Sequence, residues 1–254
     1  MRLGLLLVVV VVSSFPAHAY TVKNTSRGVG VHWAERTVDF VVSGAGDKKK
    51  DHRLPDATTK AAANWSATGE VRIAVFGPDK VAPVGYVDGE GTLNVSAWSG
   101  KVWDEDEDML AVTYLHYKTD TGEILDADIV VNDTDFLWTD ADEAPVPNAY
   151  DLTNTLTHEM GHALGLGHSE VGSATMFWTS YAMETSKRDL DADDVSAMQS
   201  LYAKVPQIAD PDVALVDPAA PAGCQSTSGD APGMALSLAA IAWLSDHRRR
   251  KIAG

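Results

Sequence analysis

The chain has 254 residues, of which 36 are acidic and 20 are basic, and its formal net charge is −16. Residues 20–223 are more acidic still, with 34 acidic and 15 basic side chains and a net charge of −19. Such a body repels nucleic acid and anionic lipid, which excludes both as partners. The only cysteine is Cys224, so no disulfide can form within the chain, and the fold depends on its core and on any bound metal.

The first 19 residues have the pattern of a secretory signal peptide. Arg2 precedes an apolar run over residues 3–12, and Ala-His-Ala at 17–19 is a small-x-small cleavage site. A membrane anchor is the alternative, but the run is about half of the roughly 20 residues that a spanning helix requires. We therefore expect export, with Tyr20 as the first mature residue and an extracellular or cell-surface location.

Two strands and a helix are predicted before residue 80. "RTVDFVVS" at 36–43 and "EVRIAVFGP" at 70–78 alternate apolar and polar residues, as strands do. "LPDATTKAAANWSATG" at 54–69 has Pro55 near its start and Gly69 at its end, which are typical helix boundaries.

Residues 83–108 are rich in glycine and acidic residues, and they predict a long loop with at most one short edge strand. "MLAVTYLHYKTDTGEILDADIVVND" at 109–133 then predicts two strands around a turn at 120–122. Strands, a helix, more strands and a further helix together indicate an α/β or α+β layer arrangement in one domain, residues 20–205.

A histidine-bearing helix is predicted from an N-cap at Asp151 to Gly165, over "DLTNTLTHEMGHALG". At 100° per residue, His158 and His162 lie within 40° of each other, opposite an apolar face. Two histidines four residues apart can bind one zinc ion, and Gly165 lets the chain turn so that His168 completes three nitrogen ligands. The fourth zinc position is then left for water.

Glu159 is adjacent to a ligand but rotated away from it, so it can face that water without binding the metal. We expect it to act as general base and then as general acid. A solvated, histidine-rich helix is the alternative for the five-residue pattern H-E-x-x-H alone. The glycine and the third histidine at their offsets in "HEMGHALGLGH" argue against that alternative.

The pattern H-E-x-x-H-x-x-G-x-x-H, followed by a methionine turn, resembles the metzincin metalloproteases. Ser169 after the third histidine is similar to the matrixin branch, and "ATMFWTSY" supplies Met176 for the turn that forms an apolar floor under the metal. "LDADDVSAMQSLY" resembles the matrixin terminal helix, in which Asp193 and Asp194 would tie that helix to the methionine turn.

The resemblance covers residues 30–205 and implies a metzincin-type catalytic domain of α/β (α+β) class. Its parts would be a twisted, mostly parallel mixed sheet of about five strands, the active-site helix and two further helices. The implied activity is that of a zinc metalloendopeptidase, with an extended protein or peptide substrate bound at the sheet edge near "GEILDADIVVN". We expect a monomer.

Several departures from the family pattern limit what can be carried over. His32, His52 and His116 have unconvincing spacing for a second, structural zinc, so one catalytic Zn²⁺ is expected. No cysteine lies between Tyr20 and the helix, which excludes cysteine-based latency. The tyrosine that shapes the S1′ pocket in this family is displaced by about one position, with Tyr181 the nearest candidate.

After the catalytic domain, residues 206–223 form a linker rich in proline, alanine and aspartate, and residues 224–254 form a separate tail. The tail has Cys224, a short apolar run and an arginine cluster, and it resembles bacterial sorting signals of the MYXO-CTERM type. That resemblance implies a tail-processing enzyme as partner and attachment to the cell surface. A disordered tail is the alternative.

Two other functions fit parts of the sequence. One is a non-catalytic, zinc-stabilised surface-binding module, which would leave Glu159 without a purpose. The other is a calcium-dependent adhesive domain built around the acidic stretch at 104–108, which would leave the histidine spacing to chance. Ca²⁺ is in any case a possible second cofactor.

Overall fold

The computed structural model describes residues 19–43, 53–79, 84–86, 93–98, 103, 105, 107–139 and 146–205. All of these belong to one unit of the chain, Met1–Ala209. The predicted linker, the C-terminal tail and the signal segment up to residue 18 lie outside the described residues. None of the helices described is long and apolar enough to span a membrane.

A five-stranded sheet with the order β2-β1-β3-β5-β4 forms the base of the fold. Its strands are β1 (Thr37–Ser43), β2 (Arg72–Asp79), β3 (Leu93–Trp98), β4 (Ala111–Tyr117) and β5 (Ile124–Asn132). Four strands are parallel, and β4 alone pairs antiparallel, with β5, at the end of the sheet. The sheet therefore has the predicted size and is mostly parallel, as expected.

The position of one strand differs from the prediction. β3 is an interior strand between β1 and β5 and not an edge strand; the glycine-rich and acidic residues on both sides of "LNVSAW" gave no sign of this. β5, which carries "ILDADIVVN", pairs with β4, and β4 is an edge strand, in agreement with the expected edge near this stretch. A second, two-stranded sheet of β6 (Leu137–Thr139) and β7 (Ala149–Asp151) was not predicted, because three-residue strands are too short for a recognisable alternation.

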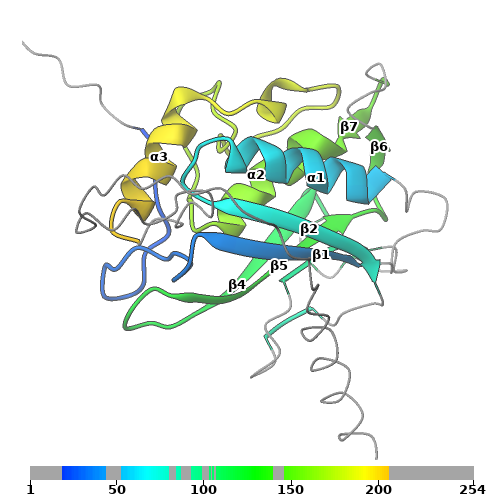
Figure 1. Ribbon diagram of the computed structural model, residues 1–254. Coiled ribbons are helices and arrows are strands. Elements are labelled where there is room, and N and C mark those ends of the chain that lie inside the picture. The colour runs from blue at the N-terminus through cyan, green and yellow to red at the C-terminus, as the bar shows by residue number, and fades with distance from the viewer. Residues whose placement is uncertain are drawn as a thin grey trace, which may run out of the picture. The chain divides into compact units, whose positions relative to one another are not determined.

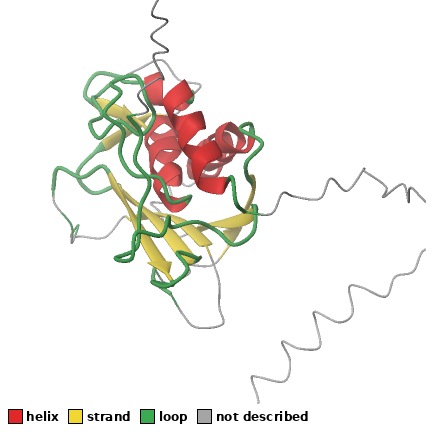
Figure 2. Ribbon diagram, turned by 90° about the vertical axis from the view of Figure 1, so that its left-hand side faces the viewer, coloured by secondary structure: helices red, strands yellow, loops and turns green. Residues whose placement is uncertain are grey.

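Three α-helices accompany the sheet, as predicted: α1 (Arg53–Ser66), α2 (Leu152–Ala163) and α3 (Ala192–Tyr202). α1 and α2 pack against each other over one face of the sheet (Figures 1 and 2). A single 3₁₀ turn, η1 (Ser186–Arg188), precedes α3 and contacts α2. The mixed α/β class is thus confirmed.

The core lies between the sheet and these two helices. Phe40 of β1, Trp65 of α1 and Leu156 of α2 are fully buried there. The Trp65 indole also donates a hydrogen bond to the carbonyl oxygen of Thr157, 2.8 Å away, so α1 is tied to the helix that carries the histidines. Packing of the core thereby fixes the position of α2 above the sheet.

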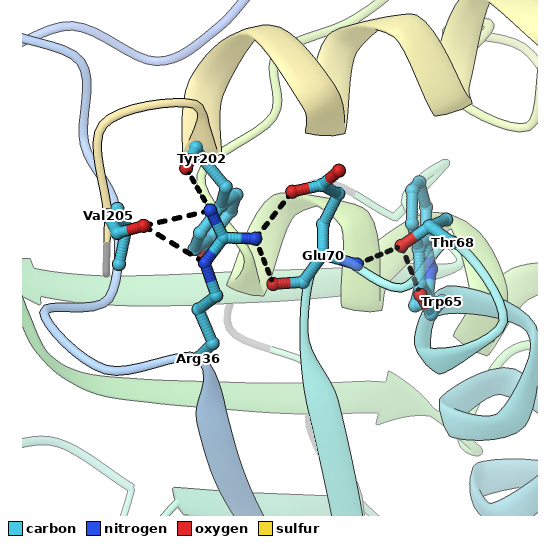
Figure 3. Close-up of polar contacts among 6 residues, drawn as sticks. All are labelled: Arg36, Trp65, Thr68, Glu70, Tyr202 and Val205. Atoms are coloured by element: carbon cyan, nitrogen blue, oxygen red, sulfur yellow. Dashed lines mark hydrogen bonds and ion pairs between the residues drawn. The ribbon is translucent and has the colours of Figure 1, made fainter. Parts of the chain in front are cut away.

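Arg36, just before β1, joins the end of α3 to the sheet (Figure 3). Its buried guanidinium donates to the carbonyl oxygens of Tyr202, at 2.5 Å, and Val205, at 2.8 and 3.1 Å. It also forms an ion pair with Glu70 at 2.6 Å. The carbonyl group of Tyr202, the last residue of α3, has no partner within the helix, and Arg36 donates a hydrogen bond to it.

Candidate metal centre and active-site cleft

α2 is the element that carries the predicted ligands, and its start is fixed by side-chain contacts. The Asp151 carboxylate accepts a hydrogen bond from the backbone N–H of Asn154 at 2.7 Å, as an N-cap does. Arg188 from η1 forms an ion pair with the same carboxylate at 2.5 Å. Both interactions hold the helix in register, so His158 and His162 are presented one turn apart at its other end.

The chain then reverses at Gly165, as the sequence predicted. Gly165 has a φ of +96°, and a Cβ atom there would overlap the carbonyl oxygen of Val31. The returning segment is paired with the N-terminal residues. Lys23 N–H donates to Gly165 O at 2.9 Å, and the Thr21 hydroxyl donates to the carbonyl oxygen of His168 at 2.7 Å. These bonds hold the backbone of His168 beside α2.

The three histidines meet at one point. Their potential ligand atoms all lie within 4.8 Å of one another, and the Nε2 atoms of His162 and His168 are 3.2 Å apart. The opposite nitrogens of two rings are engaged by the backbone: His158 Nδ1 lies 2.7 Å from Thr175 O, and His162 Nδ1 lies 2.9 Å from Leu166 O. Each of these rings therefore carries its proton on Nδ1 and offers a lone pair on Nε2.

This donor set fits a zinc ion. Nitrogens at 2.0–2.1 Å from a tetrahedral zinc are separated by about 3.3 Å, close to the separation of His162 and His168. Burial lowers the pKa of all three imidazoles below its ordinary value, most strongly for His158. The rings are therefore neutral at physiological pH, which is the form that binds a metal.

Glu159 lies beside the histidines and is 7% exposed. Burial raises the pKa of its carboxyl group, and a hydrogen bond from Thr113 on β4 opposes that shift. The Thr113 Oγ1 atom is 2.7 Å from Glu159 Oε2. The sequence predicts the carboxylate of Glu159 but not its contact with Thr113, because the two residues are far apart in the chain.

Met176, the predicted residue of the methionine turn, is 1% exposed. Its side chain fills the space left by Gly161 of α2. Asp194 of α3 accepts hydrogen bonds from the backbone N–H groups of Thr175, at 2.7 Å, and Met176, at 3.0 Å, and so ties α3 to this loop.

Asp193 was expected to contact the methionine turn together with Asp194, but its carboxylate contacts other residues. Its carboxylate accepts hydrogen bonds from the Ser169 hydroxyl at 2.7 Å and from the backbone N–H of Ala19 at 3.2 Å. Adjacent residues on a helix point in directions about 100° apart, so the two carboxylates cannot reach the same loop. Asp193 thus supports the segment that follows His168.

The histidines and Glu159 open into a cavity of about 640 Å³. One wall is the edge strand β4, from Ala111 to Leu115, and the opposite wall is formed by Trp178, Thr179 and Ser180. Tyr181, the predicted pocket residue, is 66% exposed and does not line this cavity. The wall is instead set by the three residues that precede it.

Lys187 holds this wall through hydrogen bonds to two of its neighbouring residues. This residue was not predicted from the sequence. Its side chain is buried, and the ammonium donates hydrogen bonds to Phe177 O and, at 3.0 Å, to Ser180 Oγ. Its backbone N–H donates to Asn154 Oδ1 at 2.7 Å, which anchors η1 on α2. A lysine in a polar stretch of sequence reads as a surface residue, so no pattern indicated this contact.

The remaining candidates lie apart from the centre. His116 stacks on the Tyr86 ring with a centroid distance of 4.2 Å, and His32 Nδ1 lies 2.8 Å from Gly30 O. His52 is outside the described residues, as are two of the acidic residues at 104–108. Among the residues that the structure describes, only the trio on and after α2 forms a cluster suited to a metal.

Comparisons of this sequence with known proteins point to one family. The chain is 39% identical to matrilysin of Rattus norvegicus over 72 residues, 28% of this chain and 26% of the relative. It is 47% identical to metalloendoproteinase 1-MMP of Arabidopsis thaliana over 60 residues, which are 24% of this chain and 16% of the relative. It is 40% identical to metalloendoproteinase 1 of Glycine max over 73 residues, which are 28% of this chain and 24% of the relative.

These alignments span about a quarter or less of each relative's own length. The family comparison is much longer, because the matrixin family model matches residues 32–203, which include the whole sheet, all three α-helices and the histidine cluster. The chain therefore belongs to the matrixin family.

Proposed function

We propose that this protein is a zinc-dependent endopeptidase that hydrolyses peptide bonds in protein substrates. The observation that carries the proposal is the convergence of three neutral imidazoles beside a buried carboxylate, at the opening of a cleft. His158, His162 and His168 would hold the metal. When bound, zinc lowers the pKa of a coordinated water and polarises the carbonyl group of the substrate.

The residues of the chain would perform the remaining steps. Glu159 takes a proton from the attacking water and later delivers it to the nitrogen of the departing amine. Its buried position supports this role, because burial raises the pKa of the carboxyl group and so makes the carboxylate a better proton acceptor. Met176 provides an apolar floor that restricts movement of the histidine rings.

The substrate would bind in an extended conformation along β4. Among the described residues, this strand is at the edge of the sheet, and several of its residues also line the cavity. A peptide that adds to an edge strand gains main-chain hydrogen bonds regardless of its sequence. Its carbonyl groups would then lie opposite the histidines, and Trp178–Ser180 would contact its side chains.

We further propose that the enzyme acts outside the cell or at its surface, with one zinc ion per chain. The signal-like residues 1–19 and the sorting-like tail at 224–254 support the location. Because no cysteine lies between Tyr20 and α2, we propose that the enzyme is not kept inactive by a cysteine bound at the zinc.

Cleavage of casein and of a quenched-fluorescence peptide library by the purified protein tests this function. Glu159→Ala is the matched control, because it keeps all three histidines. We expect the original protein to cleave and the variant to bind one zinc without cleaving. If the zinc-loaded original protein and the variant are equally inactive, the chain is a zinc-stabilised binding module and the proposal is wrong.

A further inference from the structure

Thr113 on β4 contacts the carboxylate that the proposed function uses as its base. Its Oγ1 atom lies 2.7 Å from Glu159 Oε2 and 3.1 Å from the Glu159 backbone oxygen. Both are hydrogen-bonding distances, and the shorter one joins a hydroxyl donor to a charged acceptor.

The sheet fixes the direction of this hydroxyl. β4 pairs antiparallel with β5, with Thr113 opposite Ile129, and side chains alternate between the two faces. Tyr114 and His116 are exposed on one face, whereas Ala111, Thr113 and Leu115 lie on the face toward α2. The Thr113 side chain therefore points at the helix because of its position in the strand.

The Glu159 carboxylate has few other partners. Among the described residues, Thr113 is the only side chain that donates a hydrogen bond to it, and no cationic nitrogen lies within 4.0 Å. A carboxylate that is 7% exposed has little access to solvent, so a single donor decides which of its oxygens is engaged. Oε2 is held, and Oε1 is the oxygen left for chemistry.

We propose that Thr113 is a positioning residue for the general base, and that its hydroxyl holds Glu159 with Oε1 directed at the attacking water. The inference rests on the proposed function. A general base works only within hydrogen-bonding reach of the proton that it removes, so free rotation of this carboxylate would reduce the fraction of productive encounters.

The hydroxyl is not required by the strand itself. Valine has nearly the same shape as threonine and an equal preference for β-structure, so packing at position 113 needs only a branched side chain. Thr113→Val therefore removes the donor with little change in shape, and Thr113→Ser restores the donor without the methyl group. The pair separates hydrogen bonding from packing.

The experiment compares the zinc-loaded full-length protein with both variants on one quenched peptide. We expect Thr113→Val to lower kcat by about 10- to 100-fold at nearly unchanged KM, because a hydrogen bond to a charged group is lost. Thr113→Ser should keep kcat within about threefold of the original protein. Zinc content and the thermal midpoint of Thr113→Val should match those of the original protein.

A second measurement does not depend on turnover. Acetohydroxamate can bind a metal through both oxygens and offers a proton to a well-placed carboxylate. Its Kd should rise about tenfold in Thr113→Val and stay unchanged in Thr113→Ser.

The inference is overturned if the valine variant keeps its kcat, or if the serine variant loses as much as valine does. It is also overturned if Thr113→Val and Thr113→Ala both fail to retain zinc, since the residue would then support the metal site and not the base. These outcomes differ from failure of the proposed function, in which the original protein itself cleaves nothing.

Discussion

Gly161 on α2 lies so close to Met176 that a Cβ atom on the glycine would overlap the methionine Sδ. The same atom would approach the Trp65 ring to 2.8 Å. The glycine between the two helical histidines therefore lets the methionine pack directly against α2. Its position in the sequence is explained by packing and not by flexibility of the helix.

Gly161→Ala should destabilise the protein. Alanine gains about 1 kcal/mol in helix propensity, but overpacking against two buried side chains costs about 1–3 kcal/mol and displaces Met176. We expect a lower free energy of unfolding in urea and weaker zinc retention. Gly172→Ala is the control, because nothing lies within 4 Å of a Cβ atom there. Equal stability of both variants would refute the packing argument.

Arg36→Met should separate the end of α3 from the sheet. The change removes the guanidinium hydrogen bonds to Tyr202 O and Val205 O and the ion pair with Glu70, while Tyr202 O keeps the backbone N–H of Val205 at 3.0 Å. A loss of about 3 kcal/mol in the free energy of unfolding is expected. Arg72→Met, at an exposed position of β2, should change stability by less than about 0.5 kcal/mol. Urea titration of the two variants provides the comparison, and a similar small effect in both would contradict the assignment.

Asp126 predicts a dependence of stability on pH. Burial and the neighbouring Asp128 raise the pKa of Asp126 from 3.8 to about 6 in the folded state. The folded state therefore binds the proton more tightly than the unfolded chain, and the stability present below pH 3.8 is lost as the pH rises through about 6.

Asp126→Asn removes this titration. The variant should be more stable than the original protein by on the order of 2 kcal/mol at pH 8, and the difference should shrink toward pH 4. Asp39→Asn, an exposed carboxylate on β1, is the control and should show no such trend. Urea unfolding between pH 4.5 and pH 8 measures the difference, and a constant offset over that range would show the interpretation to be wrong.

Lys187→Met tests the brace behind the cavity wall. The substitution keeps the length of the side chain but removes the donors to Phe177 O and Ser180 Oγ. Since the proposed function places substrate side chains against that wall and no reacting group on it, we expect KM to rise about tenfold with a smaller change in kcat. Lys118→Met, which breaks an exposed ion pair with Glu123, serves as control. A selective loss of kcat in Lys187→Met would place the lysine in the chemistry instead.

The features predicted from sequence are those that depend on local periodicity and end signals. The span of α2 follows from Asp151, the 3.6-residue repeat and Gly165, and the convergence of His158 and His162 follows from the helix alone. The positions of β1 and α1 follow in the same way, whereas α3 was expected from the resemblance of "LDADDVSAMQSLY" to the matrixin terminal helix. These elements are specified by residues within one or two turns of each other.

The features missed depend on contacts between distant segments. Thr113 and Glu159 are 46 residues apart, and the pairing of β4 with β5 together with the packing of α2 against these strands brings them into contact. β3 is an interior strand, and the sequence does not reveal this because the order of strands in a sheet is set by packing, which no short window of sequence contains. Tyr181, the nearest candidate from sequence, lies outside the cavity lining, and the three residues before it form the wall, where Lys187 from outside the motif donates to Ser180 Oγ.

The central claim is that His158, His162 and His168 bind one catalytic zinc ion. The most direct test is elemental analysis of the purified, dialysed protein beside His162→Ala. We predict one zinc per chain in the original protein, removal of that zinc by a chelator, and less than a tenth as much in the variant. Folded, zinc-reconstituted protein that retains no stoichiometric metal, or that retains it equally without His162, would contradict the account.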